Sequence, residues 1–430
     1  MKIRARRAAD AIWLDDAINI RGLKRVAADY AGKVPPPACA PSTGKRIAVV
    51  GGGPSGLSAA YYLQLMGHQV TVFEVLPELG GMLRYGIPNY RLPKERLDDD
   101  INAILQTGVE VKCGVRIGED ISVQQLRADY DAVLIAIGAS TDKKLDMEHE
   151  GAKGVMSAVQ FLQLVGKNEA PDLTGQEVAV VGGGNVSMDA VRTAVRLGAK
   201  KVSIVYRRRV ADMTALPAEI EGAVSEGVEL KTLQAPLRIE LDEEGAVKGL
   251  WTTPQMISKI KDGRASVVPS GEQEQFVPCT TLIVAIGQSI ETEHFENAGV
   301  PVERGKIMAE KFGGFANVPG VFAGGDCATG PATVIRAVAA AKVLAANIDE
   351  YLGYNHKITC DVEVPDPRLS DYSPCGRVEM REREAGERIH DFEGVEACMT
   401  EKEACQEAGR CLRCDHFGFG LFKGGREKVW

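Results

Sequence analysis

The sequence predicts an α/β protein with two Rossmann-like domains, the second inserted in the first. A glycine-rich loop occurs twice, in KRIAVVGGGPSG and in EVAVVGGGNVSMD. Each copy lies between an apolar segment of strand length and a helical pattern, which is the order of a βαβ unit. The apolar segment at 131–140 recurs in similar form at 280–289, beyond the second loop. That repetition indicates that the chain leaves the first domain and later returns to it.

This order divides the chain into four expected regions. Residues 1–43 form a short helical segment and a linker, because VPPPACAPSTG cannot continue a helix. The outer domain comprises 44–171 plus 281–354, and the inserted domain comprises 172–280. The remainder, 355–430, is a polar, cysteine-rich tail.

Composition narrows the class of protein. The formal net charge of -8 argues against a nucleic-acid partner. No apolar run is long enough to span a bilayer, so no membrane span is expected. The N-terminus is basic but lacks an apolar signal core, and Asp10, Asp15 and Asp16 weaken an organelle-targeting interpretation. We therefore expect a cytoplasmic protein.

The first loop has the spacing of a dinucleotide site. Gly51 permits the tight turn, Gly53 lets a pyrophosphate approach the backbone, and Gly56 lets the helix pack on the strand. The strand is expected at 46–50, the helix at 54–66 and the next strand at 69–74. Pro54 and Ser55 open that helix, whose free N–H groups face the phosphates. Glu74 ends the next strand, where an acid binds ribose hydroxyls.

The second loop is a variant of the same pattern. Gly182 and Gly184 are followed by Ser187, which is small enough to replace the third glycine. Asn185 and Val186 open the helix and are expected to contact the second dinucleotide. Asp189 is expected to make a structural polar contact.

The residue that reads the ribose differs between the two units. Tyr206 stands where the first unit has Glu74, and Arg207, Arg208 and Arg209 follow it. Loss of the carboxylate removes a repulsion of a 2′-phosphate, and arginines supply charge-assisted hydrogen bonds to it. We therefore expect NADP(H) here, the alternative being a solvated run of charge.

These motifs resemble the small, flavin-bearing subunit of NADPH-dependent glutamate synthase and its relatives, including flavin subunits of electron-bifurcating transhydrogenases. The stretch GGMLRYGIPNYRLPK at 80–94 carries the resemblance, with further matches at 206–228 and 324–337. It implies a glutathione-reductase-like arrangement, with FAD in the outer domain and NADP(H) in the inserted one. Hydride then passes between nicotinamide C4 and flavin N5. Because the cofactors supply this chemistry, we expect no dominant catalytic acid or base.

The resemblance also implies further cofactor contacts. Asp326, in GGDCATG, is expected to bind the ribityl chain of FAD, the alternative being a helix N-cap. The remaining cofactor-binding residues that we expect on this basis are Gly81, Met82, Leu83, Arg91, Gly138, Gly287, Gly325 and Thr333.

The cysteines depart from the patterns of related proteins. Relatives carry an N-terminal domain with two iron–sulfur clusters, whereas no cysteine here precedes Cys39. Residues 18–30 resemble the end of that domain, and EAGRCLRCD at 407–415 resembles its opening. Nor do Cys113, Cys279 and Cys327 have the close neighbour that a redox-active dithiol requires.

A metal site in the tail is therefore expected to provide the electron outlet. The predicted ligands are Cys375, Cys405, Cys411 and Cys414, with Cys398 as an alternative to Cys375. Four thiolates suit a [4Fe–4S] cluster or, as the alternative, a structural zinc. Thiols without a metal, or shared with a partner, are a third possibility.

We accordingly expect an FAD-dependent NADPH oxidoreductase subunit that passes electrons through the cluster to other redox subunits. An electron-bifurcating transhydrogenase-type complex fits best. A glutamate synthase small subunit and an NADPH:ferredoxin reductase, with ferredoxin as partner, are alternatives. A nucleotide-binding structural subunit without turnover is the alternative from another class.

Overall fold

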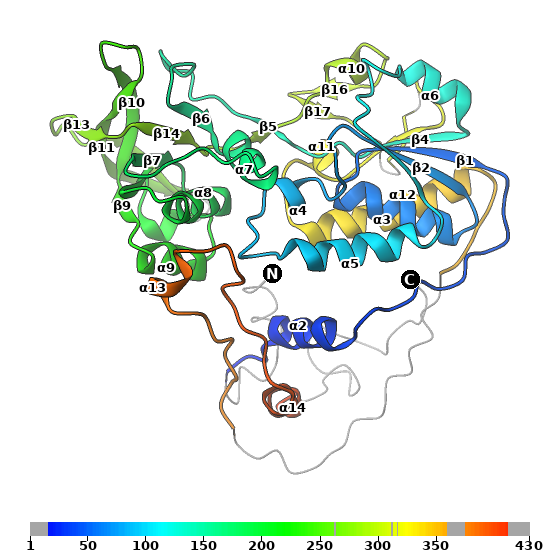
Figure 1. Cartoon of the computed structure of the whole chain (residues 1–430). Helices are drawn as coiled ribbons and strands as arrows, with labels where there is room; N and C mark the ends of the chain where they lie inside the picture. Colours follow the sequence, from blue (N-terminus) through cyan, green and yellow to red (C-terminus); the bar gives the residue numbers. More distant parts are fainter. Residues whose placement is uncertain (1–15, 262–263, 311–312, 316, 359–374, 412–430) are drawn as a thin grey trace. The chain divides into compact units, whose positions relative to one another are not determined.

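The computed structural model describes residues 16–261, 264–310, 313–315, 317–358 and 375–411 (Figure 1). The chain divides into two compact units. The larger comprises 37–354 and 384–393, and the smaller contains the described residues of 1–36, 355–383 and 394–430. No helix in the described ranges is long and apolar enough to cross a membrane.

The larger unit contains two parallel sheets of five strands. The first has the order β18-β4-β1-β2-β3, with β1 Arg46–Val50, β2 Gln69–Glu74, β3 Glu110–Cys113, β4 Ala132–Ile135 and β18 Val321–Ala323. The second has the order β6-β14-β7-β8-β9, with β6 Val155–Ser157, β7 Glu177–Val181, β8 Lys201–Tyr206, β9 Glu229–Thr232 and β14 Thr281–Val284. The predicted α/β class with two Rossmann-like sheets is thus confirmed.

The strand at 281–284 differs from the expected domain boundary. We placed it at the start of the returning outer domain, but β14 pairs with β7 and β6 in the second sheet. Its near-copy, β4, pairs with β1 and β18 in the first sheet. The two similar segments therefore occupy equivalent positions in separate sheets. Each sheet has its own strand beside the strand that precedes the glycine-rich loop. The repeated segment therefore reflects two similar sheets, and does not mark the point at which the chain returns to the first sheet.

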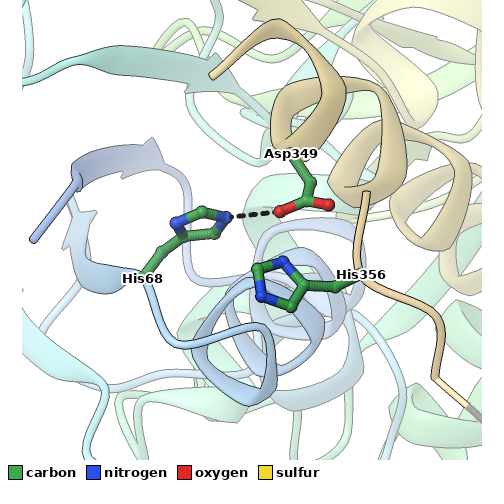
Figure 2. Close-up of side chains that lie close together, drawn as sticks. All are labelled: His68, Asp349 and His356. Carbon is green, nitrogen blue, oxygen red and sulfur yellow. Dashed lines mark hydrogen bonds and ion pairs between the residues drawn. The ribbon is translucent and has the colours of Figure 1, made fainter. Parts of the chain in front are cut away.

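Helices cover the first sheet on the side where α3 and α12 pack together (Figure 1). His68, wholly buried after α3, shares a hydrogen bond of 2.9 Å with Asp349 of α12 (Figure 2). This contact ties the end of α12, the longest helix among the described residues, to the first βαβ unit. The helices grouped with the first sheet are α3 Pro54–Leu65, α4 Met82–Tyr85, α5 Lys94–Leu105, α6 Val123–Asp129, α10 Glu293–Glu296, α11 Asp326–Thr329 and α12 Val334–Tyr351.

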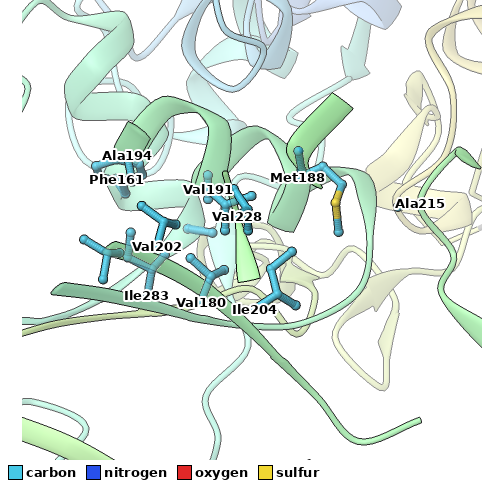
Figure 3. Packing of buried hydrophobic residues seen from close by; sticks show 14 of the residues in the cluster. Phe161, Val180, Met188, Val191, Ala194, Val202, Ile204, Ala215, Val228 and Ile283 are labelled. Atoms are coloured by element: carbon cyan, nitrogen blue, oxygen red, sulfur yellow. The ribbon is translucent and has the colours of Figure 1, made fainter. Parts of the chain in front are cut away.

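The second sheet is buried on both faces. Its helical face packs Val180, Val202, Ile204 and Ile283 against Met188 and its neighbours in α8 (Figure 3). The other face meets an antiparallel sheet that the sequence analysis did not anticipate. The helices are α7 Ala158–Gly166, α8 Asn185–Arg196, η2 Val210–Asp212, α9 Pro217–Ser225 and α13 Ala385–Arg388. The antiparallel strands are β10 Gln234–Leu241, β11 Val247–Lys261, β12 Arg264–Pro269 and β13 Gln275–Pro278.

Short strands complete the larger unit. They are β5 Thr141–Asp142 with β15 Gln288–Ser289, and β16 Val302–Glu303 with β17 Lys306–Ile307.

The smaller unit joins both ends of the chain around one buried carboxylate. Its helices are α2 Ile20–Tyr30 and α14 Glu401–Gly409. Glu407 is fully buried and accepts hydrogen bonds from the backbone N–H of Asn19 at 2.6 Å and of Val378 at 2.8 Å. Arg410 donates to the same carboxylate at 2.8 Å. The described parts of 1–36 and most of the described tail thus belong to one unit, whereas 37–43 and residues 384–393 of the tail belong to the larger unit.

Candidate functional site

The first glycine-rich loop requires glycine for measurable reasons. Gly51 has φ +111°, and a Cβ on it would lie 2.5 Å from the carbonyl oxygen of Ala136. A Cβ on Gly56 would lie 1.9 Å from the carbonyl oxygen of Gly51. Helix α3 starts at Pro54, where the missing N–H leaves no helical hydrogen bond unmade. The loop therefore requires glycine at positions 51 and 56 and accepts proline at position 54.

Glu74 anchors this loop from the end of β2. Its carboxylate accepts the N–H of Gly52 at 2.6 Å and the N–H of Leu76 at 2.8 Å. Burial raises the pKa of Glu74, and these backbone donors partly oppose the rise. The acid thus lies beside the loop, as the motif predicted, with its oxygens already oriented by backbone hydrogen bonds.

A cavity opens at the carboxyl end of the first sheet. Ser55 lines it with a buried hydroxyl that has no hydrogen-bond partner among the described residues. Gly53 lines it with open space, since a Cβ there would meet only the Cα of Gly81, at 3.9 Å. An unpaired donor beside an open glycine fits a phosphate group. The predicted residues that line this cavity are Gly51, Gly53, Pro54, Ser55, Glu74, Gly81, Met82, Gly138 and Asp326.

Asp326 lies where the first sheet's last strand ends. Burial raises the pKa of its carboxyl, and a hydrogen bond from the backbone N–H of Ala332 opposes the rise. Asp326 is also the first residue of α11. Gly325, not Asp326, is the N-cap of this short helix. Asp326 lines the cavity, and its contact with a ribityl chain stays a prediction.

Several predicted residues lie outside the linings of both cavities. Gly56 packs α3 against the loop, and the positive φ of Gly325 places it against Ser55. Leu83 accepts a hydrogen bond from Lys94, and Thr333 precedes α12. Arg91 binds Asp189, with two N–O distances of 2.7 and 2.9 Å. Asp189 is therefore a structural contact, as expected.

Other residues of the first cavity were missed. Gln163 reaches it from α7, and His294 lines it from α10. Arg116 also lines it and pairs with Glu291 at 3.2 Å. These side chains come from separate segments without a motif, so no local sequence signal identifies them.

The second loop has the same course but different contacts. Gly182 has φ +150°, and Ser187 accepts the N–H of Gly184 at 3.3 Å through its hydroxyl. The ring of Tyr206 lies against Gly183, where an added Cβ would be 2.6 Å from it. Its hydroxyl donates to the carbonyl oxygen of Asp212 at 2.8 Å. A neutral ring thus fills the position that a carboxylate fills in the first unit.

Two of the three arginines after β8, Arg207 and Arg208, line a second cavity. Arg208 is fixed there by a hydrogen bond of 2.8 Å from its Nε to the carbonyl oxygen of Ala265. Arg209 instead pairs with Asp212 at 2.8 Å. The guanidinium groups of Arg207 and Arg208 suit an anionic group such as a 2′-phosphate. The predicted residues that line this cavity are Gly182, Gly184, Asn185, Val186, Arg207, Arg208 and Gly287.

Lys143 adds a cation that the sequence analysis missed. It lines the second cavity and contacts Gly287. Strands β14 and β8 flank β7 on opposite sides. Lys143 therefore lies on the β14 side of the loop, opposite the arginines on the β8 side.

The two cavities share walls. Helix α7 lines the second cavity with Ala158 and Val159 and the first with Gln163. Likewise, Asp326 lines the first cavity, whereas Pro331 and Ala332 line the second. The hydrogen bond between Asp326 and Ala332 joins these walls directly. The two cavities are therefore neighbours, lined by different residues of α7 and of the segment 326–332.

Comparison with protein families gives a clear result. The model for pyridine nucleotide-disulphide oxidoreductases matches residues 45–341. The chain belongs to this family. It is thus an FAD-dependent oxidoreductase, in agreement with the enzyme class that the loops predicted.

Two curated proteins and one solved structure illustrate the similarity. This oxidoreductase is 38% identical to the NADP(+)-dependent formate dehydrogenase subunit beta of Moorella thermoacetica, over 96% of this chain and 64% of that protein. It is 34% identical to the small chain of glutamate synthase [NADPH] of Escherichia coli (strain K12), over 78% and 75% respectively. The predicted resemblance is thereby confirmed.

The fold is also that of a solved reductase. Mycobacterium tuberculosis FprA, in complex with NADPH, aligns with a TM-score of 0.63 at 20% identity, covering 72% of this chain and 85% of that one.

The described cysteines of this oxidoreductase are all free. Burial raises the pKa of Cys327 to about 11 and that of Cys279 to about 12, so both are protonated thiols. Cys113 is exposed and, like these two, has no close cysteine in sequence. The described residues thus hold no disulfide beside the first cavity, despite the family's name.

The predicted metal ligands are only partly described. Cys375, Cys405 and Cys411 belong to the smaller unit, and Cys414 lies outside the described residues. The three described sulfurs do not gather within 4.8 Å of one another.

Proposed function

We propose that this chain is a flavin-dependent NADPH oxidoreductase subunit, in which hydride passes between NADP(H) and FAD. The observation that carries the proposal is the pair of loop-based cavities with shared walls, α7 and the segment 326–332. Hydride transfer requires direct contact between the nicotinamide and flavin rings. Neighbouring cavities along α7 and the segment 326–332 support such a contact. Bound FAD would exchange a hydride with the nicotinamide and pass electrons singly to other centres.

The chain's own residues would bind and orient both cofactors. At the first cavity, Ser55 and the start of α3 hold the pyrophosphate, and Glu74 accepts from a ribose hydroxyl. Asp326 accepts from the ribityl chain. At the second, Gly184 and α8 hold the other pyrophosphate.

The choice of NADP(H) over NAD(H) rests on the end of β8. Arg207 and Arg208 line the cavity there, whereas the carboxylate of Asp212 is engaged by Arg209. The 2′-phosphate would meet cations and a neutral ring at this place. Supporting this, the relatives from Moorella and Escherichia coli carry NADP(+) or NADPH in their names.

For the electron outlet, we propose a [4Fe–4S] cluster bound by Cys375, Cys405, Cys411 and Cys414. One observation supports it: the larger unit offers no pair of cysteines close in sequence, and its described cysteines are all free, so a dithiol outlet is not available there. Cys398 remains the alternative to Cys375.

We further propose that the chain works in a cytoplasmic redox complex. The Moorella relative is named as a subunit, and this chain spans 64% of that relative's length. A bifurcating transhydrogenase-type complex is our first choice of setting. A glutamate synthase small subunit is the second candidate, favoured by the similarity to the Escherichia coli chain. An NADPH:ferredoxin reductase is the third.

An anaerobic titration tests the core of this proposal. The purified protein should carry FAD, and NADPH should bleach the visible absorbance of the flavin far more efficiently than NADH. Protein without flavin, or flavin that NADPH leaves oxidised, would overturn the oxidoreductase assignment and favour a structural subunit.

Metal analysis tests the outlet separately. Anaerobically purified protein should contain iron and sulfide, and replacing Cys411 by serine should remove them while FAD stays bound. Zinc in stoichiometric amount, or no metal, would contradict the cluster.

A further inference from the structure

A buried ionic network connects the segment beside the first cavity to the helix that starts at the second. Arg91 belongs to the stretch that follows α4, and α4 lines the first cavity through Met82 and Tyr85. Asp189 belongs to α8, the helix that begins next to Gly184. The Arg91–Asp189 pair has N–O distances of 2.7 and 2.9 Å, and the Asp189 side chain is only 6% exposed.

A second layer of charge supports this pair. Arg91 also approaches Glu219 of α9 at 3.2 Å, and Glu219 binds Arg192 of α8 at 2.8 Å. Arg192 continues to Glu226 at 2.7 Å. The chain of pairs thus runs from the segment after α4 through α8 to the end of α9.

Tyr90 closes the network on its other side. It is 2% exposed, and the guanidinium of Arg196 lies 4.0 Å from the centre of its ring. Arg196 also binds Glu226, at 2.6 Å. Consecutive residues, Tyr90 and Arg91, therefore both contact α8, which holds this segment at two points.

A segment from the C-terminal region completes the arrangement. Helix α13 lies beside α9 (Figure 1). Its Arg388 donates to the fully buried carboxylate of Glu226 at 2.7 Å and to the hydroxyl of Ser225 at 3.0 Å. Nearby, the side-chain amide of Asn89 donates to the carbonyl oxygen of Phe392 at 3.0 Å. Residues 384–393 thus contact both ends of the network, at α9 and at the segment before Arg91.

We propose that Arg91 and Asp189 form a positioning pair that fixes the two cavities relative to each other, and that residues 384–393 reinforce it through Arg388. The inference rests on the proposed hydride transfer. Neither Arg91 nor Arg388 lines a cavity, so neither contacts the reacting rings. Arg91 contacts α8 directly, whereas Arg388 acts on α8 through Glu226, which binds Arg192 and Arg196. Both thereby act on the alignment of donor with acceptor. Small misalignments are costly, because hydride transfer falls steeply with misplacement of the reacting atoms.

Single-turnover reduction of the holoprotein by NADPH tests this role. Arg91→Ala should lower the limiting rate of flavin reduction at saturating NADPH by about tenfold or more. The apparent dissociation constant for NADPH and the FAD content should stay within about twofold of wild type. Arg91→Lys, which retains the charge and one hydrogen bond, should recover part of the rate. Arg388→Ala should lower the rate less.

The double variant and a matched control sharpen the test. Arg91→Ala with Arg388→Ala should cost less than the product of the single effects, because both act on the same helix. Arg96→Ala removes an exposed arginine that pairs with Asp99 at 3.5 Å, and should leave the rate unchanged. An unchanged limiting rate in Arg91→Ala, or a loss confined to NADPH affinity, would overturn the positioning role.

The two proposals fail in different ways. If wild type is not reduced by NADPH, the proposed function fails. If wild type is reduced and Arg91→Ala is reduced equally fast, only the positioning role fails. If Arg91→Ala loses FAD, the residue holds the flavin site instead, which also contradicts the proposal.

Discussion

The two glycine-rich loops share a backbone course and differ in how they close. At the third position of the first loop, a Cβ on Gly56 would lie 1.9 Å from a carbonyl oxygen, whereas Ser187 occupies that position in the second. At the following strand end, Glu74 binds a loop N–H at 2.6 Å. In the second unit the ring of Tyr206 packs on the loop instead.

The same βαβ backbone can therefore place a negative charge or positive charges beside the ribose of a bound dinucleotide. The first loop offers a carboxylate beside the ribose position, and the second offers a neutral ring with Arg207 and Arg208 beyond it. The frame supplies the pyrophosphate contact in both. We propose that the residue at the strand end selects the dinucleotide.

The third position should tolerate a side chain only in the second loop. Gly56→Ala is expected to cost about 3 kcal/mol or more in the free energy of unfolding and to abolish FAD binding, because the added carbon meets backbone. Ser187→Ala should cost about 1 kcal/mol or less, since it loses one long hydrogen bond. Denaturant unfolding and flavin content measure both. Equal costs would show that the loops close alike.

The arginines after β8 should select the phosphorylated coenzyme. Replacing Arg207 and Arg208 together by alanine is expected to weaken NADPH binding about 100-fold, from two charge-assisted hydrogen bonds of about 1.5 kcal/mol each. NADH binding should change little. Arg209→Ala is the matched control, because Asp212 already engages that guanidinium. If the double variant loses affinity equally for NADPH and NADH, the 2′-phosphate assignment is wrong.

Tyr206→Glu would give the second unit the acid of the first. A carboxylate at this strand end should repel a 2′-phosphate and accept a free ribose hydroxyl. We expect NADPH to bind about tenfold more weakly and NADH more tightly. Tyr206→Phe removes only the hydrogen bond to Asp212 and should leave the coenzyme ratio unchanged. Binding titrations with both coenzymes measure the ratio, and an unaltered ratio in Tyr206→Glu would contradict this role.

The smallest effect concerns pH. Burial raises the pKa of Glu74, so the folded, flavin-free protein binds a proton that the unfolded chain has already released. The stability of wild type relative to Glu74→Gln should therefore fall as pH rises from the ordinary glutamate pKa through the raised one. Unfolding at several pH values measures this slope. The difference in stability between Tyr206→Phe and wild type should not change with pH in that interval. If it did change there, a group other than Glu74 would be responsible.

The sequence anticipated the local parts of both sites. The strands at 46–50 and 69–74 have the predicted bounds, and Gly51, Glu74, Gly182 and Arg208 all lie at their expected cavities or beside them. These features are readable because spacing within one βαβ unit fixes their geometry. Arg91 was instead expected at a cofactor, and the structure places it on Asp189. Its partner lies in another sheet's helix, which no local pattern reveals.

The same distinction holds for the molecule as a whole. Sequence alone determined the α/β class, the two loops and the contrast between Glu74 and Tyr206, because hydrophobic period and glycine spacing are local properties. Only the tertiary structure decided that the strand at 281–284 joins the second sheet, that Lys143 and Gln163 line cavities, and that Arg388 binds Glu226. Those contacts join residues distant in sequence, and long-range packing, not local preference, brings them together.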